Sequence, residues 1–267
     1  SVLFCIECPK SSTENAFSFG MRVLPMCSKN VMILCVCCVA VVMSCGYGRC
    51  SNFKDEAEFA YSDTAGNSDV IVFSARNSME YAFSQRLEGV WKAAGRYGKS
   101  GGEKNVERYS SEQRINYLFA GKVYTSVITK WLTDEFAGIH RQYYIGPALG
   151  YRFIDGPAHF LSTEAGANYT VVDYVDHSVE RFIEGRASAE YEYVIMPKTR
   201  FKSSIEFFYN FEEGDAFNIN SEVSLVNSLD EYLAIKTIIE IEYNNKPVPS
   251  TLKKTDTVLS VALVFTY

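Results

Sequence analysis

The segment Thr257–Tyr267 reads TVLSVALVFTY, and its side chains alternate between two kinds. Because successive side chains of a β-strand point to opposite faces, a period of two predicts a strand with one continuous apolar stripe. A strand that faces lipid has such a stripe and carries an aromatic ring where lipid meets water. The residues of the stripe are Leu259, Val261, Leu263, Phe265 and Tyr267.

An ordinary last strand of a soluble sheet would also alternate, but it would not need to end on the aromatic residue without a polar tail. An aromatic end preceded by alternate apolar residues resembles the assembly signal of bacterial outer-membrane barrels. We therefore expect the stripe to act as this signal, with outer-membrane lipid and the barrel-assembly machinery as partners. The expected location of the protein is the bacterial outer membrane.

The same alternation continues over most of the chain from about residue 56. Segments 139–153, 180–193, 198–211 and 232–243 each place apolar and aromatic residues on one face and charged residues on the other. Turns rich in glycine, asparagine and aspartate separate about twelve strands of roughly 10–15 residues. The pattern predicts an all-β fold, an antiparallel up-and-down transmembrane β-barrel of about twelve strands over residues 55–267.

A soluble β-sandwich is the alternative, because it also has an apolar and a polar face. Three features favour the membrane barrel. The strands exceed the roughly 5–6 residues that are usual in soluble sheets. Tyrosine and phenylalanine, 18 of each, gather near the strand ends, as in interfacial girdles. The polar face carries both signs of charge, which suits a water-filled or salt-bridged lumen.

The composition sets further limits on function. The chain has 267 residues, of which 47% are hydrophobic, and a formal net charge of −6 at pH 7. So high an apolar content argues against a disordered chain. The negative charge argues against a general nucleic-acid-binding protein, which needs a basic face, so no nucleic acid is expected as a partner.

The N-terminal part is built differently from the rest. Met21 starts a stretch with two basic residues, followed by the uncharged run Val31–Met43 and by small residues. This order predicts a secretory signal peptide over residues 21–48. The run is short of the roughly 20 residues that a spanning helix needs, which disfavours the alternative of a permanent anchor. Residues 1–20 precede this start and are interpreted as an upstream extension.

All eight cysteines lie within the first fifty residues. The barrel region therefore has no disulfide framework, thiolate metal site or cysteine nucleophile. The sequence around Cys45 faintly resembles a bacterial lipoprotein cleavage site, which leaves lipidation of Cys45 open.

The C-terminal stripe also predicts an orientation. If Tyr267 lies at the periplasmic rim, alternate connections must face outside, and the longest predicted loops then fall on that side, as barrels prefer. The predicted connections are 98–107, 133–138, 173–178 and 244–254 on the outside, and 154–157, 194–197 and 227–230 on the inside.

Short sequence pieces follow one another in an order that resembles a known family. They are Thr64–Ser68, Glu88–Lys92, Tyr97–Lys99, Asp134–Gly138, Gly146–Tyr151, Glu164–Tyr169 and Lys254–Thr257. With these pieces the chain resembles the salt-induced outer-membrane protein family (domain of unknown function 481) over roughly residues 55–267. The resemblance implies an outer-membrane barrel and brings no established activity.

Catalytic chemistry finds little support in the sequence. Residues 93–100 loosely match a phosphate-binding loop, but the strand–loop–helix setting that holds phosphates is absent, and we expect an exposed loop there. The three histidines, His140, His159 and His177, are not spaced as metal ligands. A lipase-like pair of a serine with His140 is the remaining enzymatic alternative, without a nucleophile-elbow motif to support it. We expect no catalytic residues, no cofactor and no metal.

The charged face supplies the candidate functional residues, because it should line the lumen. These candidates are Arg76, Glu80, Lys92, Arg96, Arg114, Lys122, Lys130, His140, Arg152, Glu164, Glu184, Arg186, Glu190, Arg200, Lys202, Glu206, Glu222, Lys236 and Glu240. If they line water, the protein is a small passive channel for ions or solutes. If they pair across the lumen, the barrel is plugged and serves as a structural or docking element.

We therefore expect a non-enzymatic outer-membrane barrel, either a small porin-like channel or a cell-envelope-integrity protein that responds to salt or osmotic conditions. The alternatives are a plugged structural or docking barrel and an outer-membrane lipid hydrolase. A soluble lipid-binding barrel is a third class, which release from membranes by high salt without detergent would favour.

Overall fold

The structure, a computed structural model, describes residues 52–64, 70–248 and 250–267. The predicted upstream extension (1–20), the signal peptide (21–48) and Cys45 lie outside these described residues. No helix in the described part of the chain has the length and the apolar character that crossing a bilayer requires.

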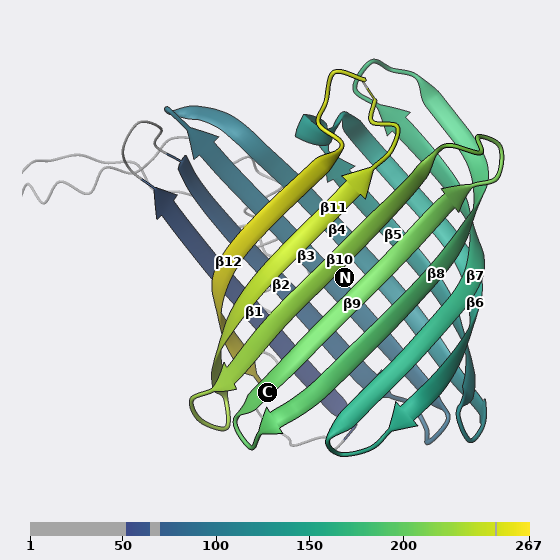
Figure 1. The fold of residues 1–267 in the computed structure, drawn as a ribbon, viewed down its shortest axis with the longest axis vertical. Helices are drawn as coiled ribbons and strands as arrows, with labels where there is room; N and C mark the ends of the chain where they lie inside the picture. Colours follow the sequence, from purple (N-terminus) through teal and green to yellow (C-terminus); the bar gives the residue numbers. More distant parts are fainter. Residues whose placement is uncertain (1–51, 65–69, 249) are drawn as a thin grey trace, which may run out of the picture. The chain divides into compact units, whose positions relative to one another are not determined.

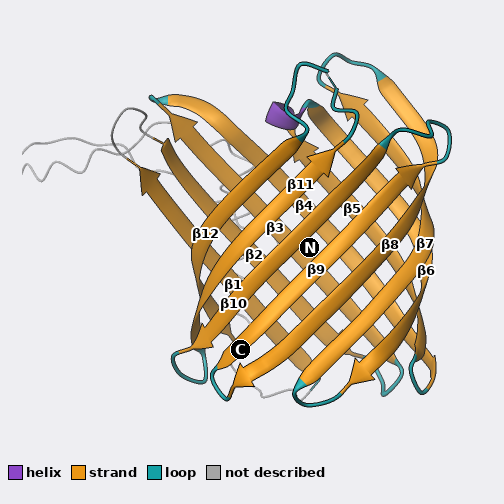
Figure 2. Cartoon of the chain, in the orientation of Figure 1, coloured by secondary structure: helices purple, strands orange, loops and turns teal. Residues whose placement is uncertain are grey.

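The described residues form one closed sheet of twelve strands (Figures 1 and 2). Each strand pairs antiparallel with its neighbour in the sequence, and β1 pairs with β12, which confirms the predicted up-and-down barrel. The strands are β1 (Phe53–Thr64), β2 (Val70–Ala82), β3 (Leu87–Ser100), β4 (Glu103–Ala120), β5 (Val123–Asp134), β6 (Ile139–Asp155), β7 (His159–Tyr174), β8 (Val179–Met196), β9 (Thr199–Asn210), β10 (Phe217–Ser228), β11 (Leu233–Asn244) and β12 (Thr255–Thr266).

The two faces of the sheet differ as the alternation predicts. On β6, the outward side chains of Ile145 and Leu149 are exposed, whereas the inward Tyr144 and Ala148 are buried. The outward positions of β12 are likewise exposed, with Leu259 the most exposed at 67%. The apolar face of the sheet therefore lies outside and the charged face inside, as a barrel in lipid requires. The role of the β12 stripe as an assembly signal stays a prediction.

The connections define two rims that are used below. The inner rim, where β12 ends, holds the connections 83–86, 121–122, 156–158, 197–198 and 229–232. The outer rim holds the described connections 101–102, 135–138, 175–178, 211–216 and 245–254, with the single-turn helix η1 (Glu135–Ala137) in the second of them. The longest described connection, 245–254, lies at the outer rim.

One predicted connection is wrong. Residues 98–107 were expected to form an exposed loop, but β3 and β4 continue almost to each other and turn over Gly101 and Gly102 alone. Both glycines have positive φ, 57° and 87°, a conformation that suits a tight hairpin turn. Most of the residues expected in the connection lie on strand ends, which a barrel can extend beyond the hydrocarbon into water.

Aromatic side chains on the outward face gather toward both rims. Tyr117 and Phe119 pack edge to face near the inner rim, with ring centroids 5.2 Å apart. Phe217 and Tyr243 pack near the outer rim at 5.7 Å. Aromatic residues at two such levels are what the interfacial girdles of a membrane barrel require.

The seam between β1 and β12 closes the barrel with fewer pairs than its neighbours. Among the described residues it has five, from Glu56–Thr266 to Ala60–Ala262, whereas every other seam has at least eleven. Backbone hydrogen bonds between Asp55 and Tyr267, at 3.1 and 2.9 Å, extend it at the inner rim. The end of the chain therefore contributes a large share of the closure.

Removing Phe265–Tyr267 should prevent stable closure, because it deletes two of the five pairs and both hydrogen bonds to Asp55. Gel electrophoresis of unheated and heated outer-membrane fractions measures this, since a closed barrel migrates faster before heating. We expect the fast-migrating band to be lost. Deleting residues 250–252 of the outer connection should leave it, and an equal effect of the two deletions would contradict this account.

Candidate functional site

The interior of the barrel contains two cavities. The inner cavity has a volume of about 720 Å3 and is lined from Lys54 and Glu192 near the inner rim up to Arg108 and Glu242. The outer cavity has about 350 Å3 and reaches the connection 245–254. Four residues line both cavities and are called the junction. They are Arg108, Lys130, Asn220 and Glu242.

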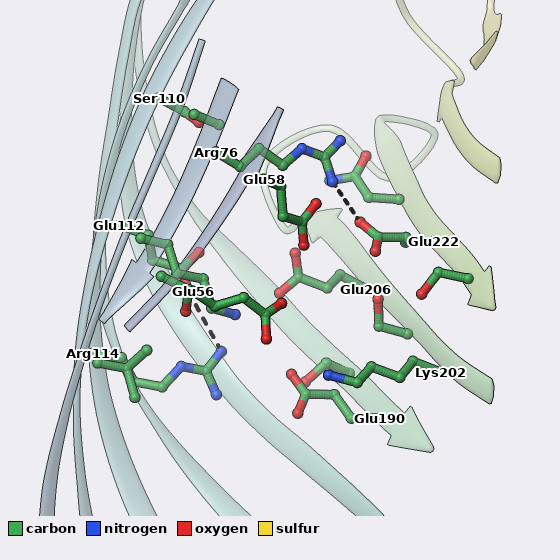
Figure 3. Close-up of a pocket in the computed structure, with 18 of the residues that line it drawn as sticks. Glu56, Glu58, Arg76, Ser110, Glu112, Arg114, Glu190, Lys202, Glu206 and Glu222 are labelled. Carbon is green, nitrogen blue, oxygen red and sulfur yellow. Dashed lines mark hydrogen bonds and ion pairs between the residues drawn. The ribbon is translucent and has the colours of Figure 1, made fainter. Parts of the chain in front are cut away.

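Ion pairs cross the lumen beside the seam. Arg76 of β2 donates to Glu222 of β10 at 3.0 Å, as Figure 3 shows, and also to Glu240 of β11. Arg96 of β3 pairs with the same Glu240, and Arg108 of β4 pairs with Glu242 of β11. These pairs join β2, β3 and β4 to β10 and β11 across the strands that lie between them.

The sequence of β12 makes room for these crossings. Its inward positions from 258 to 264 are Val258, Ser260, Ala262 and Val264, none of them charged. Because small uncharged side chains leave space, the long arginine side chains can extend over β12 to reach carboxylates beyond it. The charged face is therefore neutralised across the lumen and not only between neighbouring strands.

A second cluster lies among β4, β7, β8 and β9. Arg114 and Arg186 each donate to Glu164, at 2.7 and 2.8 Å, and Arg186 also pairs with Glu206. The side chains of Arg186 and Glu164 are only 2% and 3% exposed. Such burial of charge is tolerable because every member has a partner of opposite sign.

The remaining buried cation is paired as well. Lys236 of β11 donates to Glu58 of β1 at 2.7 Å and lies 3.2 Å from Glu222. Several buried polar atoms of the lumen have no protein partner, among them Glu58 Oε2, Ser224 Oγ and Tyr144 Oη. Water in the cavities would supply the partners that these atoms need.

Most of the lumen candidates from the sequence are inside the barrel. The inner cavity is lined by Arg76, Glu80, Lys92, Arg96, Arg114, Lys130, Arg152, Glu164, Glu190, Lys202, Glu206, Glu222, Lys236 and Glu240. Glu184 lines the outer cavity and accepts a hydrogen bond from Thr170 at 2.7 Å, whereas Arg186 is buried in the ion pairs described above.

Three candidates lie at the rims and line neither cavity. Lys122 donates to the Phe153 carbonyl at the inner rim, and Arg200 is half exposed near Glu192. His140 lies at the outer rim, 3.9 Å from Glu135, next to irregular pairing of β6 with β7. Lys122 belongs to a connection, whereas Arg200 and His140 have the parity of the inward face but lie at strand ends, beyond the cavities.

Sequence reasoning missed eight charged residues that line the inner cavity. They are Lys54, Glu56, Glu58, Glu88, Arg108, Glu112, Glu192 and Glu242. The alternation of the strands would have identified these residues, because each is an even number of positions from an inward residue of the same strand. Arg108 and Glu112 occupy the same face as Arg114, and Glu242 the same face as Glu240. Arg108 directly follows the connection predicted over residues 98–107. Its place within a strand was therefore not recognised from the sequence.

The described residues give no support to the serine–His140 pair, the phosphate-binding loop or the metal site considered from the sequence. The recorded side-chain contacts of His140 are to Glu135 and Arg141. The exposed loop expected over residues 93–100 is wrong, because these residues lie in β3 and lead into a hairpin, not into a helix. Within the described residues, no group of three or more histidine, cysteine, aspartate or glutamate side chains is placed to bind a metal.

The outer connections are tied together by charge. Lys246 lies 2.7 Å from Asp215 and 3.5 Å from Glu213, so the connections 211–216 and 245–254 are joined. The hydrogen bond from Lys246 lowers the pKa of the Asp215 carboxyl below its ordinary value. These exposed pairs shape the entrance to the outer cavity more than they stabilise the barrel.

Replacing Arg186 by methionine should destabilise the barrel by about 3 kcal/mol, because Glu206 loses its recorded ion-pair partner and Glu164 keeps only Arg114. Urea unfolding of the reconstituted protein measures the free energy of unfolding. Lys202→Met is the matched control, since Lys202 lies 3.9 Å from Glu192 in a half-exposed pair, and it should change stability by less than about 1 kcal/mol. Equal effects of the two substitutions would refute the importance of the buried cluster.

No curated protein sequence matches this chain. Among solved structures, the chain is similar to the translocator domain of the autotransporter NalP from Neisseria meningitidis. The identity is 9% and the TM-score 0.50, with 89% of this chain and 95% of that one covered. It is also similar to an outer-membrane channel from Pseudomonas putida F1, with 12% identity, a TM-score of 0.50 and coverage of 81% and 95%.

At these identities the likeness concerns the fold, which is that of bacterial outer-membrane barrels. The sequence itself gives a second result, because the family described as protein of unknown function DUF481 matches residues 57–267. That match includes nearly all of the barrel and its charged lumen. The chain belongs to the DUF481 family.

Proposed function

We propose that the protein is a narrow outer-membrane channel for ions and small hydrophilic solutes. The observation that carries this proposal is that two cavities adjoin inside the barrel. The inner cavity begins near the inner rim, the outer cavity begins at the outer connections, and the two adjoin at the junction. Cavity space therefore extends from near the inner rim to the outer connections, with charged side chains lining the inner part and apolar side chains such as Tyr144 and Phe208 sharing the outer part.

The charges of this route predict its selectivity. Twelve glutamates and ten lysines or arginines line the inner cavity. Because most of them are paired, the field that a passing ion meets is weak, and the small excess of carboxylates favours cations. A weakly cation-selective, low-conductance pore is the expected behaviour.

The two cavities meet at the junction. Arg108 reaches Glu242 there, and Lys130 lies on the same wall. Two long side chains that meet in this way obstruct a solute but can separate when ions screen their attraction. Salt should therefore open the route. This opening would be the mechanism of the response to salt that the sequence analysis expects.

A plugged barrel is the second candidate, and the ion pairs that cross the lumen favour it. If Arg76, Arg96 and Arg108 never leave their carboxylates, the barrel is a rigid structural element or a docking surface. The two candidates differ in a measurable property, because only the channel conducts without any change of sequence.

Single-channel recording in planar bilayers tests the proposal. The unmodified protein should give a small current, and the double variant R108A/E242A should raise the conductance several-fold because it removes the side chains that meet at the junction. Arg200→Ala is the control, since Arg200 lines neither cavity. Silence of both the unmodified protein and the double variant would refute the channel. Current from the double variant alone would establish the plugged barrel.

The salt dependence is a separate prediction. Because screening weakens the ion pairs at the junction, conductance should rise more steeply with salt concentration than the conductivity of the bathing solution does. The ratio of the two quantities, measured between low and high salt, should increase for the unmodified protein and stay constant for R108A/E242A. A constant ratio for both proteins would contradict the proposed role of the junction.

A further inference from the structure

The outward face of the barrel carries a polar group where lipid is expected. Gln113 of β4 points outward and is exposed, between Tyr109 toward the outer rim and Tyr117 toward the inner rim. Neighbouring outward positions hold Ser111 on the same strand and Thr129 on β5. The outer polar patch is defined as Trp91, Ser111, Gln113 and Thr129.

These side chains form one hydrogen-bonded chain across three strands. The Trp91 indole donates to the Ser111 hydroxyl at 3.1 Å, and the Gln113 amide nitrogen donates to the same hydroxyl at 2.8 Å. The Thr129 hydroxyl donates to the Gln113 carbonyl oxygen at 2.8 Å. The chain holds Gln113 in one orientation against the sheet.

The patch differs from the apolar stretches of the outward face. On the opposite side of the barrel, the corresponding part of β11 and β12 carries Ile239, Leu259 and Val261. A carboxamide in hydrocarbon costs several kcal/mol unless it is hydrogen-bonded. The bonds within the patch offset much of this cost, but lipid tails offer no partner to the groups that stay unbonded, so this face fits protein better than lipid.

The internal bonds leave specific groups unused. The Gln113 amide nitrogen carries two N–H groups and has one recorded acceptor. The Ser111 hydroxyl accepts twice and has no recorded acceptor for its own proton. The Gln113 carbonyl oxygen has a second lone pair. The patch therefore offers unused donors and an unused acceptor within a few ångströms.

A set with both donors and acceptors can pair with a copy of itself. A twofold axis that passes beside Gln113 would let the two amides exchange a pair of N–H···O bonds, the isologous arrangement of a symmetric dimer. Small outward residues next to the patch, Ala75 and Ala93, would let two barrel walls approach closely, as small residues do in other membrane interfaces.

We propose that the outer polar patch is the dimer interface of this barrel and that its occupant is a second copy of the chain. Gln113 lies at the centre of the interface and pairs with Gln113 of the other copy. The inference needs the barrel to lie in a membrane but does not need it to conduct, so failure of the channel and failure of the dimer are distinguishable.

Cross-linking in the membrane tests the geometry. In the full chain with its eight leader cysteines replaced by serine, Gln113→Cys should give a disulfide-linked dimer on a non-reducing gel. Ile239→Cys, outward on the opposite wall, is the matched control and should stay monomeric. Equal cross-linking from both positions would show random collision and overturn the proposal, as would a cross-link from Gln113→Cys to a different protein.

Stoichiometry tests the energetics. Single-molecule photobleaching of the full chain in liposomes should show dimers, and Gln113→Leu should shift most of the protein to monomers while its heat-modifiable gel mobility shows an intact barrel. Ile239→Leu should leave the dimers unchanged. A monomeric unmodified protein, or dimers that persist in folded Gln113→Leu, would overturn the proposal.

Discussion

Every backbone N–H and C=O group that lies in hydrocarbon must find its partner within the protein, and this requirement shapes the whole barrel. Strands can meet it only when the sheet closes, so β1 must pair with β12 even though their seam is short. Closure in turn separates two environments. Apolar side chains of β6 and β12 point outward, and the charged side chains on the other face of the strands point into the lumen.

The charges of the lumen follow from this confinement. A carboxylate or guanidinium inside a narrow cylinder must be hydrated or paired. Glu164, held by Arg114 and Arg186, is paired, whereas the unpartnered oxygen of Glu58 is left to water. The same interior thus contains both a salt-bridged framework and wet cavities, and the balance between them at Arg108 and Glu242 decides whether ions pass.

The sequence predicts the barrel well because one physical rule, alternation, acts locally on every strand. It places Arg76, Glu222 and Glu240 on the inner face without any knowledge of the fold. It cannot say that Arg76 reaches β11 across two intervening strands and β10 across three, because that depends on the curvature of the closed sheet and on the small inward residues of β12. The division into two cavities is for the same reason a property of the structure alone.

Local errors have local causes. The charged residues around Gly101 and Gly102 resemble a loop, yet strands that extend into water carry the same composition. His140 has the parity of the inward face, but it lies at the outer end of β6, where the pairing with β7 becomes irregular. Its side chain is therefore at the rim and not, as alternation alone would predict, in a cavity. For Gln113, alternation correctly predicts the outward face. Only the structure shows that its side chain is hydrogen-bonded to Ser111 and Thr129.

The central claim is that the apolar face meets lipid while the charged face meets the lumen. Spin labels placed one at a time along residues 141–153 of β6 in reconstituted protein test it directly, through collisions with lipid-soluble oxygen and with a water-soluble paramagnetic reagent. The account predicts high oxygen accessibility at odd-numbered positions in the middle of the strand and low accessibility at even-numbered positions. Odd-numbered positions that are shielded from oxygen, with even-numbered positions open to bulk water on the outside of the sheet, would contradict it.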